Sequence, residues 1–223
     1  MINFNNKNIK LVIFDLDGTL IASTSLWSDI DKNFFKKRNM EVPEDYGKAI
    51  AHLGLKSAAK YTVENYFPNE KETDVIKEWH DLSIEAYSKD IPLKPHAKEI
   101  LDFLMQNGVI IALATANSKE LYEPCLSRLD IAKYFSFIID VNSVKEGKNS
   151  PEIYDRICTH FNVSRAETLI FEDMLLPIKT AYKAGYNVVA IYDKHSIMNE
   201  EESINNSHLY IKDFDDFLSI YKK

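Results

Sequence analysis

Four polar segments, far apart in the sequence, each follow a short apolar run and carry side chains that could handle a phosphate group. The first segment holds Asp15 and Asp17. Residues two apart on an extended chain point to the same side, so both carboxylates can face one substrate. One carboxylate can attack phosphorus, and the other can protonate the leaving oxygen and later activate water. The remaining segments supply Thr115 with Asn117, Lys148, and Glu172 with Asp173.

This set of side chains fits phosphoryl transfer, which needs a nucleophile, a metal and partners for the phosphate oxygens. The carboxylates of Asp15 and Asp17 would repel each other, and each pKa would be disturbed, unless a cation lay between them. We expect Asp173 to complete that cation site. Mg²⁺ suits it, because carboxylates, a carbonyl and retained waters form a hard octahedral shell. Lys148 would neutralise negative charge on Asp15 and on the phosphate.

An alternation of strand-like and helix-like stretches must position these residues. The strand-like runs are continuous rather than alternating, as in parallel strands that are covered on both faces. These strands are predicted at 11–14, 109–114, 137–139, 169–171, 188–191 and 208–211. Helices are predicted between and after them, at 97–107, 119–129, 151–161, 177–184 and 213–221. The alternation predicts an α/β fold with a doubly wound parallel sheet, in which ligands bind beyond the carboxyl ends of the strands.

One long stretch, residues 28–89, interrupts the alternation and contains no strand-like run. Its periodicity predicts helices at 29–38, 44–51, 57–66 and 72–87. Small polar residues at 21–28 and prolines within 88–95 predict hinges on both sides. We therefore expect two domains: an α/β core made of residues 1–20 and 93–223, and an inserted all-helical cap made of residues 21–92.

The composition excludes several classes of protein. The 223 residues include 27 Lys and Arg against 34 Asp and Glu, and the net charge of -7 argues against a nucleic-acid partner. The longest apolar stretch near the middle, 109–114, is too short to cross a membrane, and the Asn-rich start lacks the apolar stretch of a signal peptide. Cys125 and Cys158 have no metal-ligand spacing, so buried free thiols are expected. We expect a cytoplasmic protein that is a monomer or a weak homodimer.

Taken together, the polar segments resemble the four motifs of the haloacid dehalogenase-like (HAD) superfamily, in order and in strand context. The motifs are Phe14-Asp15-Leu16-Asp17-Gly18-Thr19-Leu20, Ala114-Thr115-Ala116-Asn117-Ser118, Gly147-Lys148-Asn149-Ser150-Pro151-Glu152-Ile153-Tyr154 and Phe171-Glu172-Asp173. The likeness covers nearly the whole chain and is to the branch with a helical cap, which includes β-phosphoglucomutase-like phosphatases. It implies a Rossmann-like core and a magnesium-dependent phosphatase that acts through an aspartyl-phosphate. The expected substrate is a small phosphate monoester, such as a sugar phosphate or a nucleotide-like molecule.

The resemblance also implies roles for individual residues. Asp15 would be the nucleophile and a metal ligand, and Asp17 would be the general acid/base with its backbone carbonyl on the metal. Thr115 would hold a phosphate oxygen with its hydroxyl, and Asn117 could assist nearby, although an Asn here could instead cap the following helix. Lys148 would stabilise the phosphoaspartate.

The metal site would be completed by Asp173, with Glu172 alongside as a direct ligand, a water-mediated ligand or a structural acid. The family usually has Ser, and a little further on Gly, after the residue that corresponds to Asp173. This chain has Met174-Leu175-Leu176-Pro177 instead, which predicts a less polar loop beside the metal. The acid often found after the first motif is replaced by Ala22-Ser23.

Within the cap, Leu55-Lys56-Ser57 and the glycine before it resemble the family's substrate-specificity loop. Lys56 could contact a substrate anion, or it could be a solvated lysine at the start of a helix. Trp27 and Tyr61 are expected to pack in the core rather than to line the substrate cavity.

Other functions stay open at this point. A phosphomutase of the β-phosphoglucomutase type would use the same core, but Trp27 stands where those mutases carry a hinge histidine. A non-catalytic module that binds a metabolite or a protein would not need the acids and the lysine of the four motifs. An EF-hand calcium loop that starts at Asp15 is excluded, because it would need Gly at Leu20 and Glu at Leu26.

Overall fold

The computed structural model describes residues 2–50, 55–194, 196 and 200–221. The chain divides into two compact units, one formed by Met1–Thr24 with Ile91–Lys223 and the other by Ser25–Asp90. The two points of division fall within the hinges expected at 21–28 and 88–95. Whether each unit folds as an independent domain, with the limits 21–92 for the cap, stays a prediction.

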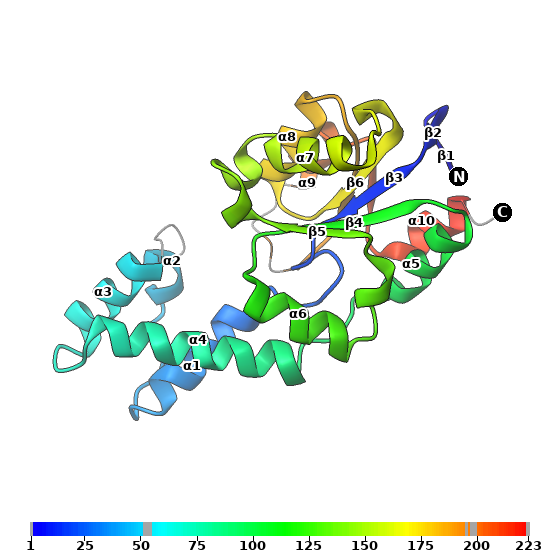
Figure 1. The fold of residues 1–223 in the computed structure, drawn as a ribbon. Coiled ribbons are helices and arrows are strands. Elements are labelled where there is room, and N and C mark those ends of the chain that lie inside the picture. Colours follow the sequence, from blue (N-terminus) through cyan, green and yellow to red (C-terminus); the bar gives the residue numbers. More distant parts are fainter. Residues whose placement is uncertain (1, 51–54, 195, 197–199, 222–223) are drawn as a thin grey trace. The chain divides into compact units, whose positions relative to one another are not determined.

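The first unit contains a six-stranded parallel sheet, which confirms the predicted doubly wound α/β fold (Figure 1). The strand order is β5-β4-β3-β6-β7-β8. The bounds are β3 Leu11–Phe14, β4 Ile110–Thr115, β5 Phe137–Asp140, β6 Thr168–Glu172, β7 Asn187–Ile191 and β8 Leu209–Ile211. Because β3 has β4 on one side and β6 on the other, the order reverses there, and ligands bind beyond the carboxyl ends of the strands at such a point in open parallel sheets.

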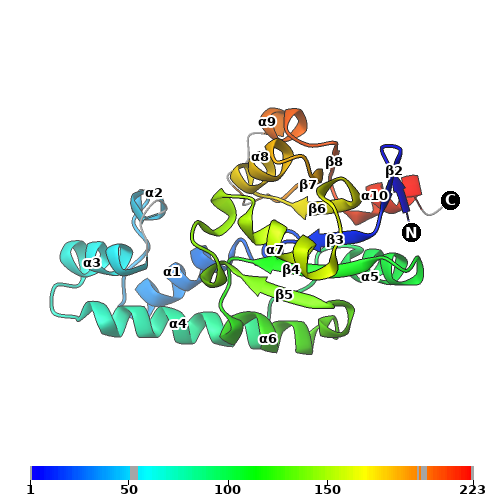
Figure 2. The ribbon, with the colours of Figure 1, turned by 45° about the horizontal axis from the view of Figure 1, so that its top comes forward.

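Helices cover both faces of this sheet, as the continuous apolar runs require (Figures 1 and 2). One face carries α5 (Ala97–Gln106), α6 (Lys119–Arg128) and α10 (Phe214–Tyr221). The opposite face carries α7 (Glu152–Phe161), α8 (Leu175–Lys183) and α9 (Glu200–Asn205). Every residue of β3, β6 and β7 is buried, so the side chains on both faces of the central strands belong to the core.

A small hairpin at the start of the chain was not predicted. Strands β1 (Ile2–Phe4) and β2 (Lys7–Ile9) pair in antiparallel fashion, with Phe4 opposite Lys7. Asn5 and Asn6 have φ values of 49° and 59°. A two-residue turn with two left-handed residues matches the twist of a hairpin, and Asn tolerates that conformation. Strands of only 3 residues in a polar stretch show no pattern in the sequence that would predict them.

Among its described residues, the second unit contains helices and no strand, as predicted. It consists of α1 (Leu26–Lys36), α2 (Tyr46–Ile50), α3 (Leu55–Tyr66) and α4 (Glu72–Lys89). Ala51, the predicted end of the second helix, and the glycine that precedes Leu55 lie outside the described residues. Aromatic rings form its core: the ring of Phe34 lies 5.6 Å from that of Phe67 and 5.7 Å from that of Trp79.

The exposure of two aromatic residues differs from the expected packing in one case. Trp27 is 51% exposed, so the expectation that it packs in the core is wrong, whereas Tyr61 is half-buried. Cys125 and Cys158 are buried free thiols, as expected. No helix among the described residues is both long and apolar enough to cross a membrane. A cytoplasmic location stays a prediction.

Candidate active site

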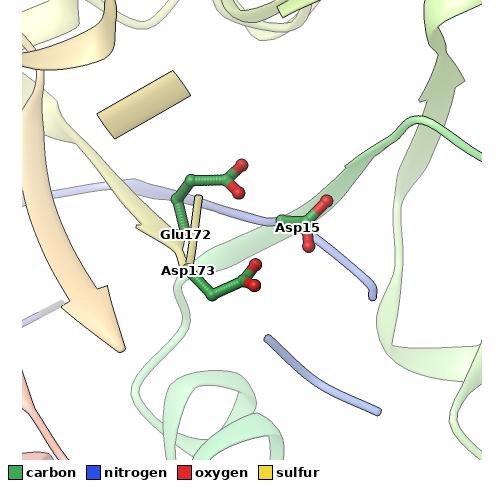
Figure 3. Close-up of side chains that lie close together, drawn as sticks. All are labelled: Asp15, Glu172 and Asp173. Atoms are coloured by element: carbon green, nitrogen blue, oxygen red, sulfur yellow. The ribbon is translucent and has the colours of Figure 1, made fainter. Parts of the chain in front are cut away.

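Three carboxylates converge at the carboxyl ends of β3 and β6 (Figure 3). The parallel pairing places Phe14 opposite Phe171, and the backbone N–H of Asp15 donates to the carbonyl of Phe171 at 3.0 Å. Asp15 therefore leaves its strand directly beside the end of β6, where Glu172 and Asp173 follow. One oxygen atom from each of these three acids lies within 4.8 Å of the other two, and all three residues are buried.

Lys148 reaches this cluster from a short 3₁₀ turn, Gly147–Asn149. Its Nζ donates to Oδ1 of Asp15 and, at 2.8 Å, to Oε2 of Glu172. Burial by itself would lower the pKa of the Lys148 ammonium, but the carboxylates of Asp15 and Glu172 raise it well above its usual range. The structure thus brings the predicted lysine and the predicted nucleophile into contact as a buried ion pair.

The remaining negative charge of the cluster fits a divalent cation. Three carboxylates face one ammonium, which leaves two negative charges when every acid is ionised. Burial, followed by the charge on Asp15, raises the pKa of Asp173 to about 7 and that of Glu172 well above its ordinary value. A nearby cation would stabilise the ionised form of such acids. Oxygen ligands are also those that Mg²⁺ prefers, so the donor set suits the predicted metal.

Because Gly18 has no side chain, the carboxylate of Asp173 can lie directly against its backbone. Its φ is +80°, and a Cβ atom at this position would lie 2.3 Å from Oδ2 of Asp173. Only glycine permits both this backbone conformation and this close approach. The glycine of the first motif therefore allows the loop after β3 to lie against the acid that follows β6.

Two hydroxyl groups bind the carboxylate of Asp173. Oγ1 of Thr19 donates to Oδ1 at 3.0 Å, and Oγ of Ser196 donates to Oδ2. The expectation of a less polar loop is met in part, because Met174 is 40% exposed. Ser196 nevertheless supplies a hydroxyl from a distant segment after β7. Ser196 was not predicted, since a single serine outside the four motifs carries no signal.

Asp17 has its own pair of donors. Oγ of Ser23 donates to Oδ1 at 2.6 Å, and Nδ2 of Asn117 donates to Oδ2. The backbone N–H of Asn117 donates to Oγ1 of Thr115 at 3.0 Å, which connects the buried end of β4 to the same network. The alternative role of Asn117 as a helix cap is wrong, because Ser118 is the N-cap residue of α6.

Lys56 belongs to the other compact unit. It lies on α3, and its side chain is exposed. Its contact with a substrate anion stays a prediction.

A buried ion pair that the sequence analysis missed supports the loop after β3. Nζ of Lys94 donates to the carbonyl of Gly18 at 2.6 Å, to the carbonyl of Tyr192 at 2.7 Å and to Oδ2 of Asp193 at 3.1 Å. Oδ1 of Asp193 accepts from Oγ1 of Thr24 at 2.6 Å. Lys94 thereby ties the loop of the first motif to the end of β7. Neither residue belongs to a motif, so only the fold shows this pairing.

Replacing Lys94 by Met should lower the free energy of unfolding by about 3–5 kcal/mol, because the buried carboxylate of Asp193 then loses the attraction of the Lys94 ammonium. Denaturant unfolding followed by circular dichroism measures this loss. The matched control is Lys98→Met, since Lys98 is exposed and its ion pair with Asp130 should contribute at most about 1 kcal/mol. A second change, Asp193→Leu, should recover part of the loss. Equal stability of the Lys94→Met variant and the wild type would contradict the structural role of this pair.

The raised pKa of Asp173 predicts a pH dependence of stability in metal-free protein. Its pKa is about 7 in the folded chain against an ordinary value of 3.8, so the folded protein retains this proton more strongly. The stability that Asp173 contributes, compared with an Asp173→Asn variant, should be highest below the ordinary pKa. It should fall as the pH rises through the folded pKa. Denaturant unfolding of both proteins in a chelator across this range tests the expectation, and a constant difference would refute it.

Comparisons with known proteins agree with this geometry. The family model described as haloacid dehalogenase-like hydrolase matches residues 12–191. A phosphorylated carbohydrates phosphatase from Thermotoga maritima is 25% identical over 88% of this chain and 90% of its own length. Validoxylamine A 7'-phosphate phosphatase from Streptomyces hygroscopicus is 25% identical over 92% of this chain and 93% of its own length.

The fold is also found among solved structures. The crystal structure of a candidate β-phosphoglucomutase from Thermotoga maritima has a TM-score of 0.84 and is 23% identical, over 95% of this chain and 98% of that one. The residues that the family model matches include parts of both compact units and all four motifs. The chain belongs to the haloacid dehalogenase-like hydrolases.

Proposed function

We propose that this hydrolase is a magnesium-dependent phosphatase that cleaves a small phosphate monoester through a phosphoaspartate on Asp15. The observation that carries the proposal is the buried carboxylate of Asp15, held by Lys148 next to two further acids. Two relatives are named as phosphatases, one of phosphorylated carbohydrates and one of validoxylamine A 7'-phosphate. These names support a sugar phosphate or a similar small molecule as the substrate class.

The first half of the reaction forms an acyl phosphate. Oδ1 of Asp15 accepts from Lys148, so Oδ2 is the oxygen that attacks phosphorus. The bond between phosphorus and the ester oxygen breaks, and Asp17 gives its proton to the leaving oxygen. Lys148 and the hydroxyl of Thr115 would stabilise the charge on the transferring phosphate.

The second half returns the enzyme to its starting state. Asp17, now a carboxylate, takes a proton from water, and the resulting hydroxide attacks the phosphorus of the phosphoaspartate. The bond between phosphorus and Asp15 breaks, and inorganic phosphate leaves. Ser23 and Asn117 both donate to the carboxylate of Asp17, and these two contacts would fix its orientation in both steps.

The acids Asp15, Glu172 and Asp173 would hold the metal. When bound there, Mg²⁺ would neutralise negative charge on the carboxylates and on the phosphate, which otherwise repel each other. Glu172 already accepts from Lys148 and from the backbone N–H of Met174 at 3.2 Å. We therefore assign Asp15 and Asp173 as the main ligands and Glu172 as an acid that acts alongside.

Replacing Asp15 by Asn should abolish phosphate release from a panel of phosphate monoesters in the presence of Mg²⁺. The amide cannot act as the nucleophile, and the expected fall in kcat is on the order of 10⁴-fold or more. The assay measures inorganic phosphate, so that an isomerised product from a mutase would be distinguished from hydrolysis. The matched control is Asp130→Asn, an exposed acid of the same unit, which should keep wild-type activity. Undiminished phosphate release by the Asp15→Asn variant would reject the proposed nucleophile.

Mg²⁺ should raise the melting temperature of the wild-type protein at neutral pH, because binding to the folded state alone stabilises it by mass action. The same addition should have little effect on an Asp173→Asn variant, which lacks one of the main ligands. Differential scanning fluorimetry over a magnesium titration measures both responses. An identical shift in the two proteins would place the bound metal elsewhere.

A further inference from the structure

The buried carboxylate of Asp173 receives a hydroxyl group at each of its two oxygen atoms. Oγ1 of Thr19, in the loop after β3, donates to Oδ1 at 3.0 Å, and Oγ of Ser196, in the segment after β7, donates to Oδ2. These are the two side-chain donors to this carboxylate among the residues that the structure describes. The last torsion of an Asp side chain is soft, so one donor alone would leave the carboxylate free to turn. A donor at each oxygen fixes its plane.

Both donors to Asp173 are uncharged, unlike the partner of the neighbouring acid. Nζ of Lys148 forms an ion pair with Asp15 and compensates its charge. A hydroxyl group orients a carboxylate without cancelling its charge, so the charge of ionised Asp173 stays available for a cation. Figure 3 shows the carboxylate of Asp173 pointing towards that of Asp15. An oriented but uncompensated carboxylate is what a metal ligand requires.

Ser196 is itself held in place by Asp193. Oδ1 of Asp193 accepts from the backbone N–H of Ser196 at 3.2 Å and from Oγ1 of Thr24 at 2.6 Å. Its Oδ2 is paired with the ammonium of Lys94 at 3.1 Å. Asp193 and Lys94 are both buried. The position of the Ser196 hydroxyl group therefore depends on a buried anchor that follows β7.

The residues next to Asp173 in the sequence do not offer a comparable donor. Met174, Leu175 and Leu176 follow it, and their side chains carry no hydrogen-bond donor. The backbone N–H of Met174 donates to Oε1 of Glu172 at 3.2 Å. A donor for the second oxygen of Asp173 therefore has to come from another segment, and Ser196 supplies it.

We propose that Ser196 is a positioning residue of the metal site, whose hydroxyl group orients the carboxylate of Asp173 for Mg²⁺. The inference rests on the proposed function, in which Asp173 is a main ligand of the metal. Removing a hydrogen-bond partner of a metal ligand typically weakens metal binding by about 10- to 100-fold. A serine that only stabilised the fold would change the stability and leave the affinity for the metal unchanged.

Isothermal titration calorimetry of the full-length protein with MgCl₂ measures this affinity directly. Ser196→Ala should weaken Mg²⁺ binding by about tenfold or more. Ser196→Thr keeps the hydroxyl group and should bind within about threefold of the wild type. The matched control is Ser219→Ala, because Ser219 is exposed on α10 and its Oγ donates to the carbonyl of Asp216 at 2.9 Å. This control should bind Mg²⁺ as the wild type does.

A second measurement separates positioning of the metal ligand from a direct role in the reaction. The Mg²⁺ concentration that gives half-maximal phosphate release should rise about tenfold in the Ser196→Ala variant. The rate at saturating Mg²⁺ should stay within about threefold of the wild type, since Ser196 acts on the ligand and not on the substrate. Thermal unfolding in a chelator, followed by circular dichroism, shows that each variant is folded.

Wild-type affinity for Mg²⁺ in a folded Ser196→Ala variant would overturn the inference, and so would an equal loss of affinity in the Ser196→Thr variant. Failure of the proposed function would give a different result, because the wild type would then neither bind Mg²⁺ nor release phosphate. If Ser196→Ala did not fold, Ser196→Cys would take its place with the same expected direction, since a thiol is a weaker donor than a hydroxyl group.

Discussion

The balance of buried charge at the carboxyl ends of β3 and β6 is the constraint on which the active site depends. Lys148 contacts Asp15 and Glu172, while Asp173 lies beside them and forms no ion pair with any lysine that the structure describes. Away from water, like charges at such short range are not tolerated unless positive charge compensates them. The excess of acids would attract a metal cation. The same excess would repel a phosphate, so metal and substrate are expected to depend on each other.

The sheet, rather than the loops, sets the spacing of these acids. Strands β3 and β6 are neighbours in a parallel pair, and the rings of Phe14 and Phe171 stack at 4.8 Å just before the acids begin. The residues after both strands therefore start from fixed positions. The loop after β3 then sets how the acids are oriented. It can lie against Asp173 because Gly18 has no Cβ, and Lys94 holds it by donating to the carbonyl of Gly18.

The sequence predicted most of this architecture because its central strands are buried on both faces and read as unbroken apolar runs. It predicted Lys148 because the motif context distinguishes that lysine from the many solvated ones. Ser196 and the pair of Lys94 with Asp193 could not be predicted, since their partners depend on how the segment after β7 folds back. Trp27 was misjudged for a related reason. Large aromatic side chains are usually buried, and only the packing of the helices shows that this one lines a cavity.

Asp31 and Asp173 show the same physical problem with different solutions. Burial raises the pKa of both carboxyl groups, so each ionised acid costs stability at neutral pH. Asp173 receives two hydroxyl donors and lies near Lys148, which compensates part of that cost. Asp31 receives no donor from the described residues, and an uncharged residue in its place would avoid the cost.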